Sequence, residues 1–258
     1  MSVSTGGRSM LALKLLLVPA FLAVISLAGK RWGPGVAGWL AGLPVLTGPI
    51  LFLLTLEHGA AFAAAAATVS LAAVFGAIAF ILTYARLCAR HSPWISLLAG
   101  LGSWCCAAIV LTQLPLTNYA SLAIAMVTLL AAPKFFPRVI GPLAANRMPL
   151  SELLLRMLAG ASVTLAVTTL AHAIGTSWTG MLAVFPVFAI VLSVFSHRLA
   201  GPAFTTLLLK AMALGLYSFA AFCFSLALLL PQQSTAASFS AAIAIALAVQ
   251  WALKSRLA

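Results

Sequence analysis

Long apolar runs alternate with short gaps, rich in polar residues, glycine or proline, along almost the whole chain. An α-helix needs about 20 consecutive apolar residues to cross the hydrocarbon of a bilayer. Lipid offers no partners to backbone groups and the alternating pattern of barrel strands is absent, so each run is predicted to be helical. The pattern predicts an all-α, polytopic membrane bundle of about nine transmembrane helices, over residues 10–28, 36–56, 60–85, 93–112, 116–132, 151–171, 178–196, 203–230 and 235–253.

Composition agrees with an integral membrane protein. Of the 258 residues, 64% are hydrophobic and 6% are charged, and the mean hydropathy is +1.18. A typical soluble domain carries charge on about a quarter of its residues. The chain has fourteen Lys and Arg residues but only two acidic residues. The basic residues lie singly or in pairs between apolar runs, not in the stripes of a nucleic-acid-binding surface. We therefore expect no nucleic-acid partner.

The basic residues also predict an orientation. With nine spans, one membrane face receives Lys30, Arg31, Arg86, Arg90, Lys134, Arg138, Arg147, Arg198, Lys254 and Arg256. The opposite face receives only Arg8. Short cytoplasmic loops carry an excess of Lys and Arg, so the C-terminus is expected in the cytoplasm and the N-terminus outside. We expect a multi-pass protein of the bacterial cytoplasmic (inner) membrane.

The two halves of the chain correspond at a constant offset of 142 residues. Shared Gly, Pro and Phe positions carry the match: Gly38 with Gly180, Pro44 with Pro186, Gly59 with Gly201, Phe62 with Phe204, and Phe80 with Phe222. Chance identity between Ala- and Leu-rich segments is the alternative, but it does not account for these rarer residues. We interpret the pattern as a duplication.

Each copy holds four spans, and the fifth span joins them. An odd number of spans before the second copy turns that copy upside down. The predicted organisation is a first four-helix repeat over residues 1–115, a linker helix with a basic cytoplasmic connector over 116–150, and a second, inverted four-helix repeat over 151–258. Many secondary transporters have this architecture, with the substrate site at the repeat interface near the midplane.

One motif in each repeat resembles a known family. The stretch Phe185–Ile190 (FPVFAI), followed by Gly201, is similar to the GlpM-like group of small bacterial membrane proteins, and so is Gly38–Pro44 (GWLAGLP) in the first repeat. Four spans make up the whole chain in that group, so the resemblance implies a fused pair of repeats. It bears on the fold more than on the function. The acidic residues that relatives often carry around Gly201 are lacking here.

Two matched prolines mark the predicted substrate site. Pro44 and Pro186 lie near the middle of corresponding spans, where proline removes an N–H and clashes with the preceding turn. A helix broken at this depth must satisfy its freed groups against protein or a water-filled cavity. Thr47, Gly48 and Ser193 lie within two turns and are predicted to line such a cavity. A plain proline kink without a ligand is the alternative.

Three basic residues fall inside the predicted spans. Lys210 lies about two turns in, where a charge costs at least about 2.5 kcal/mol on the insertion scale, so it is expected to face a cavity or a partner. An anionic substrate or a lipid phosphate would supply the missing charge, and snorkelling to the interface is the alternative. Lys14 and Arg156 correspond to each other, lie closer to span ends, and are expected to snorkel.

The sequence offers no pattern for catalysis or for a metal or cofactor. It lacks a phosphate-binding glycine loop, a nucleophile elbow and a cluster of histidines and carboxylates. The four cysteines have no metal-ligand spacing and are interpreted as packing residues. We therefore predict that the protein is not an enzyme.

The favoured function is a small secondary transporter or facilitator of an anionic or neutral solute, working by alternating access at the repeat interface. A flippase for an anionic or polyprenyl-phosphate lipid is one alternative, and a non-transporting membrane scaffold or assembly subunit is another. The predicted partners are a small solute or lipid and the surrounding membrane lipids. Association of two copies into a homodimer is kept as a further alternative.

Overall fold

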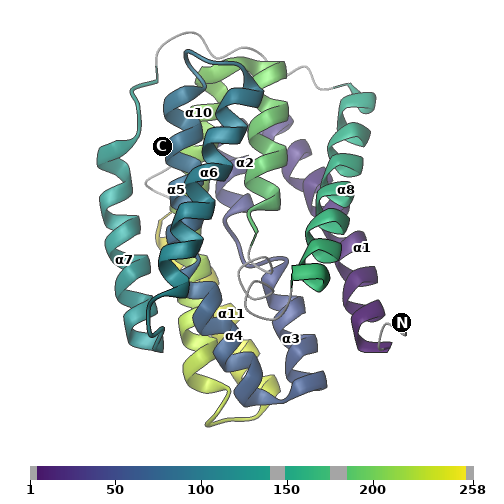
Figure 1. Cartoon of the computed structure of the whole chain (residues 1–258), viewed down its shortest axis with the longest axis vertical. Coiled ribbons are helices and arrows are strands. Elements are labelled where there is room, and N and C mark those ends of the chain that lie inside the picture. The colour runs from purple at the N-terminus through teal and green to yellow at the C-terminus, as the bar shows by residue number, and fades with distance from the viewer. Residues whose placement is uncertain (1–4, 140–148, 175–184, 254–258) are drawn as a thin grey trace.

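The computed structural model describes residues 5–139, 149–174 and 185–253, and helices account for nearly all of them. No strand occurs in these ranges. The helices are α1 (Thr5–Trp32), α2 (Pro34–Ala41), α3 (Thr47–His58), α4 (Ala60–Ala72), α5 (Val74–Leu87), α6 (Pro93–Thr112), α7 (Asn118–Phe135), α8 (Leu150–Ile174), α10 (Val187–Leu229) and α11 (Thr235–Ala252). Figure 1 shows that most of them run roughly along the long axis of one bundle.

The described part of the chain contains seven helical segments long and apolar enough to cross a membrane. They are Leu15–Trp32, Ala60–Leu87, Pro93–Thr112, Asn118–Phe135, Leu150–Thr169, Val187–Leu229 and Thr235–Ala252. Many large apolar side chains on these helices are exposed, among them Leu16, Leu98, Val127 and Leu158. Exposed apolar surface of this extent suits lipid, so the prediction of an all-α membrane bundle is confirmed.

Two predicted spans are divided in the structure: 36–56, and 60–85, which is separated at Ala73 into α4 and α5. The span predicted over 36–56 is divided into α2 and α3, and residues 42–46 between them are not helical. Proline inside this segment explains the break, because its ring is incompatible with the preceding helical turn. The span predicted over 178–196 lies partly outside the described residues. Its described part begins α10 directly after Pro186.

Three glycines, Gly33, Gly59 and Gly201, share one unusual backbone conformation. Gly33 has φ 88° and ψ 176° and separates α1 from α2. Gly59 has φ 87° and ψ 168° and connects α3 to α4. Gly201 has φ 79° and ψ 179° and divides α10 into residues 187–200 and 202–229. This region of backbone conformation is essentially restricted to glycine. Gly59 corresponds to Gly201 at the offset of 142 residues.

The starts of α6 and α11 correspond in the same way. The Ser92 hydroxyl accepts a hydrogen bond from the backbone N–H of Ile95, and Ser234 accepts one from Ala237, both at 3.4 Å. A serine in this place satisfies an N–H that lacks a partner within the helix. The two halves therefore start these helices with the same capping interaction.

The helix α10 occupies the centre of the bundle and packs against α2, α4, α5, α7 and α11. Small residues let α2 approach it closely: a Cβ added at Gly42 would lie 2.5 Å from the Gly215 backbone. On the other side, α1 packs along α8. Gly160 of α8 faces Leu22 of α1, and Arg156 contacts Ser26, so these two helices run antiparallel (Figure 1).

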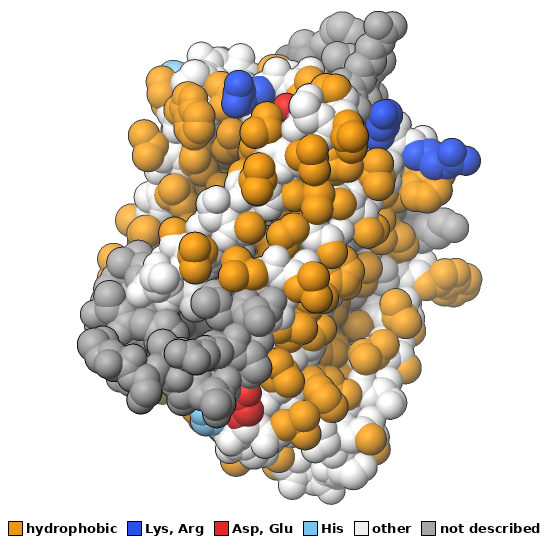
Figure 2. All heavy atoms as spheres, turned by 90° about the vertical axis from the view of Figure 1, so that its right-hand side faces the viewer, with side chains coloured by type: hydrophobic (Ala, Val, Ile, Leu, Met, Phe, Trp, Pro, Cys, Tyr) orange, Lys and Arg blue, Asp and Glu red, His pale blue; other side chains and the backbone are white. Residues whose placement is uncertain are grey.

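The two ends of the bundle differ in charge. The end that holds Gly201 and the α5–α6 turn also receives the described cations Lys30, Arg31, Arg86, Arg90, Lys134, Arg138 and Arg198. We call it the cationic end. The opposite end, around Gly59, carries Glu57 and His58. Figure 2 shows blue side chains in the upper part of one face, above a broad field of hydrophobic side chains.

Candidate functional site

A cavity of about 110 Å³ lies where the break between α2 and α3 meets the start of α10. Four segments line it, two from each half of the chain. The lining residues are Ala41, Gly42, Leu43, Leu46, Thr47, Ile50, Ala73, Val74, Ala77, Ile81, Phe185, Pro186, Val187, Phe188, Ala189, Met212, Leu216 and Phe219. The cavity is therefore built around both proline-containing segments.

The lining residues correspond in pairs at the offset of 142 residues. The pairs are Leu43 with Phe185, Leu46 with Phe188, Thr47 with Ala189, Val74 with Leu216, and Ala77 with Phe219. The matched members differ in size, with phenylalanine in the second half where the first half has leucine or alanine. Corresponding segments of the two halves thus form the two sides of the cavity, but their side chains give the sides different shapes.

Two helix N-termini face this cavity. Helix α3 begins at Thr47 and α10 begins at Val187, and neither start has a hydrogen bond from a capping side chain. The N-terminal end of a helix carries a partial positive charge. Some of the first N–H groups are already satisfied, because Gly48 donates to the Pro44 carbonyl and Val187 to the Phe185 carbonyl, both at 2.8 Å. Thr47 also contributes a hydroxyl, whereas the other lining side chains are apolar. The site offers hydrogen-bond donors in apolar surroundings.

The structure brings together part of the predicted site. Thr47 and Pro186 line the cavity. Pro44 lies in the break between α2 and α3 without lining the cavity, and Gly48 faces the Phe222 ring, 3.6 Å from an added Cβ.

Two further predicted residues lie elsewhere. Ser193 is fully buried in α10, and its hydroxyl donates to the Ile190 carbonyl at 3.1 Å. Lys210 has an exposed side chain on α10 and does not line the cavity. Both residues lie on parts of α10 that do not line the cavity, so they are separated from Thr47 and Pro186.

A polar cluster near Gly201 was not anticipated from the sequence. The Tyr84 hydroxyl lies 3.3 Å from His197 Nδ1, and the Cys88 Sγ lies 3.5 Å from the Thr206 Oγ1. These contacts join α5 to α10 at the cationic end. The corresponding positions in the other half are occupied by Leu226, Thr55, Leu230 and Ala64. No local sequence pattern indicates contacts between residues more than 110 positions apart.

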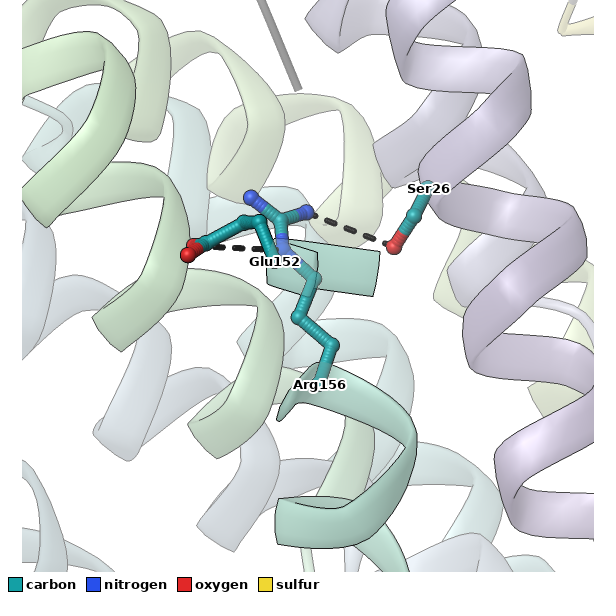
Figure 3. A network of polar contacts seen from close by, with 3 residues as sticks. All are labelled: Ser26, Glu152 and Arg156. Carbon is teal, nitrogen blue, oxygen red and sulfur yellow. Dashed lines mark hydrogen bonds and ion pairs between the residues drawn. The ribbon is translucent and has the colours of Figure 1, made fainter. Parts of the chain in front are cut away.

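Arg156 contradicts the expectation that it snorkels to the interface. Its side chain is 2% exposed. Figure 3 shows the guanidinium between the Ser26 hydroxyl on one side and the Glu152 carboxylate on the other. The close packing of α8 on α1 and α10 turns this side chain into the bundle. The side chain of its counterpart, Lys14, lies outside the described residues.

The chain has no match among protein family models, curated proteins or solved structures. In the described ranges no group of three or more His, Cys, Asp or Glu residues is arranged to hold a metal ion. The cavity and the buried Arg156 are the two features that offer recognition chemistry.

Proposed function

We propose that the protein is a small secondary transporter or facilitator that moves an anionic or neutral solute by alternating access. One observation carries this proposal: a cavity lies where the helix break at Pro44 meets the start of α10 after Pro186, and the two prolines correspond between the halves of the chain. Discontinuous helices that meet at a repeat interface are the usual substrate sites of secondary transporters.

The proposal includes two inverted repeats joined by α7. The antiparallel packing of α1 against α8 supports it, because the first helices of the two repeats then run in opposite directions. The serine caps at the starts of α6 and α11 also correspond between the halves. So do the backbone conformations of Gly59 and Gly201. The resemblance to the GlpM-like group is part of this proposal and stays a prediction.

Nine membrane crossings follow if α10 counts as two, divided at Gly201, and α2 with α3 counts as one broken crossing. An odd number places the termini on opposite sides. The concentration of basic residues at one end then puts that end in the cytoplasm by the positive-inside rule. We propose a bacterial inner-membrane protein with the N-terminus outside and the C-terminus inside.

The cavity chemistry supports an anionic or neutral solute. The starts of α3 and α10 lie among the lining residues, and the partial positive charge of a helix N-terminus attracts anionic groups. No acidic side chain is among its lining residues. The apolar walls limit the solute to a small molecule with an apolar body or little charge.

The two mouths of the proposed pathway are closed by different contacts. At the cationic end, the Tyr84–His197 and Cys88–Thr206 contacts hold α5 against α10. At the opposite end, the corresponding residues are mostly apolar. The transport cycle breaks and reforms these two sets of contacts in turn, so that the cavity opens to one side at a time.

Filling the cavity tests the proposal. Candidate solutes are first found by a thermal-shift screen of anionic metabolites and amino acids, and uptake of the hits is then measured in proteoliposomes. The Ala77→Met substitution places a longer side chain in the cavity lining and is expected to abolish uptake. Ala65 is exposed on α4, so Ala65→Met is the matched control and is expected to transport normally. Normal uptake by a folded Ala77→Met variant would remove the cavity from the pathway.

A further inference from the structure

The guanidinium of Arg156 is buried without a full set of partners. At 2% exposure, Arg156 is the largest of the fully buried side chains among the described residues. Its Nη1 donates to the Ser26 hydroxyl at 3.3 Å. Its Nε and Nη2 are enclosed and have no hydrogen-bond partner in the described structure. A buried charge with unmade hydrogen bonds is unfavourable unless another group completes it.

Glu152 does not complete these hydrogen bonds. Its Oε1 lies 3.9 Å from Arg156 Nε, which is beyond hydrogen-bonding distance. Its side chain is 19% exposed, so the carboxylate has access to the surface of the bundle. Glu152 partly compensates the charge of Arg156, but Nε and Nη2 of the guanidinium are left without hydrogen bonds.

The two unpartnered nitrogens form one edge of the guanidinium. Nε and Nη2 point their N–H bonds in nearly the same direction, and this fork matches two oxygens of a phosphate or a carboxylate. The Phe195 ring lies 5.8 Å from the guanidinium carbon and restricts where the group can turn. Figure 3 shows the Ser26 contact on the side of the guanidinium away from Glu152. Arg156 is therefore held with its binding edge free of hydrogen bonds.

We propose that Arg156 and its surroundings between α1, α8 and α10 bind an anionic oxygen group, either a lipid phosphate or a free oxyanion. The anion takes the Nε–Nη2 edge, and the Glu152 carboxylate moves away from it toward the surface. Glu152 is thus the internal competitor that partly neutralises Arg156 when no ligand is bound. This site is separate from the cavity between the broken helices, and its existence does not depend on transport.

The position of Arg156 suits both sources of the anion. It lies less than two turns from the start of α8, near the cationic end of the bundle, where Lys30 and Arg31 end α1. On the same helix, Leu154, Leu155 and Leu158 are exposed and would contact lipid. A phospholipid lying along α8 would bring its headgroup to this depth of the bundle.

Binding measured on purified protein in neutral detergent tests the proposal. Inorganic phosphate is titrated in one arm, and phosphatidylglycerol is titrated against phosphatidylcholine in the other. The readouts are the melting temperature and the bound lipid detected by native mass spectrometry. Saturation by phosphate alone identifies a free oxyanion, whereas selective retention of phosphatidylglycerol identifies a lipid headgroup.

Four variants make the result specific. Arg156→Gln is expected to weaken binding at least about tenfold, because it removes charged hydrogen bonds to the anion. Arg156→Lys keeps the charge without the fork and is expected to bind more weakly than wild type but better than Arg156→Gln. Glu152→Gln removes the competitor and is expected to tighten binding. Lys210→Gln removes an exposed cation and is expected to bind like wild type.

Several outcomes would overturn the proposal. These are no binding of either probe to wild type, unchanged affinity in a folded Arg156→Gln variant, or an equal loss in Lys210→Gln. A loss of binding in Glu152→Gln would show that the carboxylate does not compete. Size-exclusion profiles and helical circular dichroism establish that each variant is folded, and Arg156→Lys keeps the test valid if Arg156→Gln does not fold.

Discussion

Thr47 contributes the one hydroxyl among the side chains that line the cavity. Its place at the start of α3 puts that hydroxyl at the positive end of this helix. The sequence predicted this residue because Pro44 indicates a break three positions earlier. It also predicted Ser193, which is fully buried and bonded to its own helix. Distance from a proline along the chain does not decide which side of a helix a residue occupies.

Replacing the Thr47 hydroxyl should weaken solute binding. A hydrogen bond contributes about 0.5–1.5 kcal/mol, so Thr47→Val is expected to raise the KM for uptake about two- to tenfold with little change in folding. The shape of the side chain is retained. The matched control is Ser193→Ala, which removes a buried hydroxyl that does not line the cavity. An equal rise of KM in both variants would point to a general effect on the bundle.

Arg156 shows a second limit at the residue scale. From sequence it resembles any cation near a span end, which is why snorkelling was expected. Its burial depends on the side from which α1 and α10 cover α8, and this is set by contacts between residues such as Ser26 and Arg156, 130 positions apart. The sequence therefore predicted where the charge lies along the helix and missed where it points.

The helices themselves were largely predictable, and the exceptions have local causes. The predicted span 93–112 coincides with α6, because its ends are marked by Ser92-Pro93 and a polar segment. The predicted span 36–56 is two helices, since α2 ends where Gly42 and Pro44 stop it. Gly201 follows the polar segment Ser196-His197-Arg198. The gap between the two predicted crossings is so short that they form the single long element α10, divided only by the conformation of Gly201.

Alanine at Gly59 or Gly201, two of the three positive-φ glycines among the described residues, should destabilise the fold. No atom lies within 4 Å of a Cβ added at Gly59 or Gly201, so the cost comes from the backbone conformation alone. We expect a loss of about 1–3 kcal/mol for each substitution, measured by thermal unfolding in detergent. The exposed helical Gly102 also has open space around it, and Gly102→Ala is expected to be neutral or slightly stabilising. Equal stability of all three variants would contradict the assigned turns.

The close crossing of α2 and α10 predicts a different glycine effect. A Cβ at Gly42 would lie 2.5 Å from the backbone of Gly215, so Gly42→Ala must push the two helices apart. We expect a stability loss of about 1–3 kcal/mol, as for overpacked cores, together with reduced uptake because Gly42 lines the cavity. Gly35 in α2, the helix that ends just before Gly42, has no atom within 4 Å of an added Cβ, so Gly35→Ala is the control. If Gly42→Ala behaved like Gly35→Ala, the two helices would be farther apart than the structure has them.

At the scale of the whole molecule, the two ends of the bundle should be accessible from opposite sides of the membrane. His58 and Arg90 are both exposed and lie at opposite ends. A membrane-impermeant maleimide is expected to label Arg90→Cys only from the cytoplasm and His58→Cys only from outside. Cys88 and Cys223 are buried, and Cys105 and Cys106 lie in the middle of α6, so wild type should give little background. Labelling of both variants from one side would contradict the nine-crossing topology.

The cationic end has a consequence for how the protein is made and used. To insert the other way up, a chain would have to carry Lys30, Arg31, Arg86, Arg90, Lys134, Arg138 and Arg198 through the hydrocarbon. Each transfer costs about 2.5–3.5 kcal/mol on the insertion scale. The proposed orientation is therefore strongly favoured over its inverse. In that orientation, every copy presents the same end of the bundle to the same compartment.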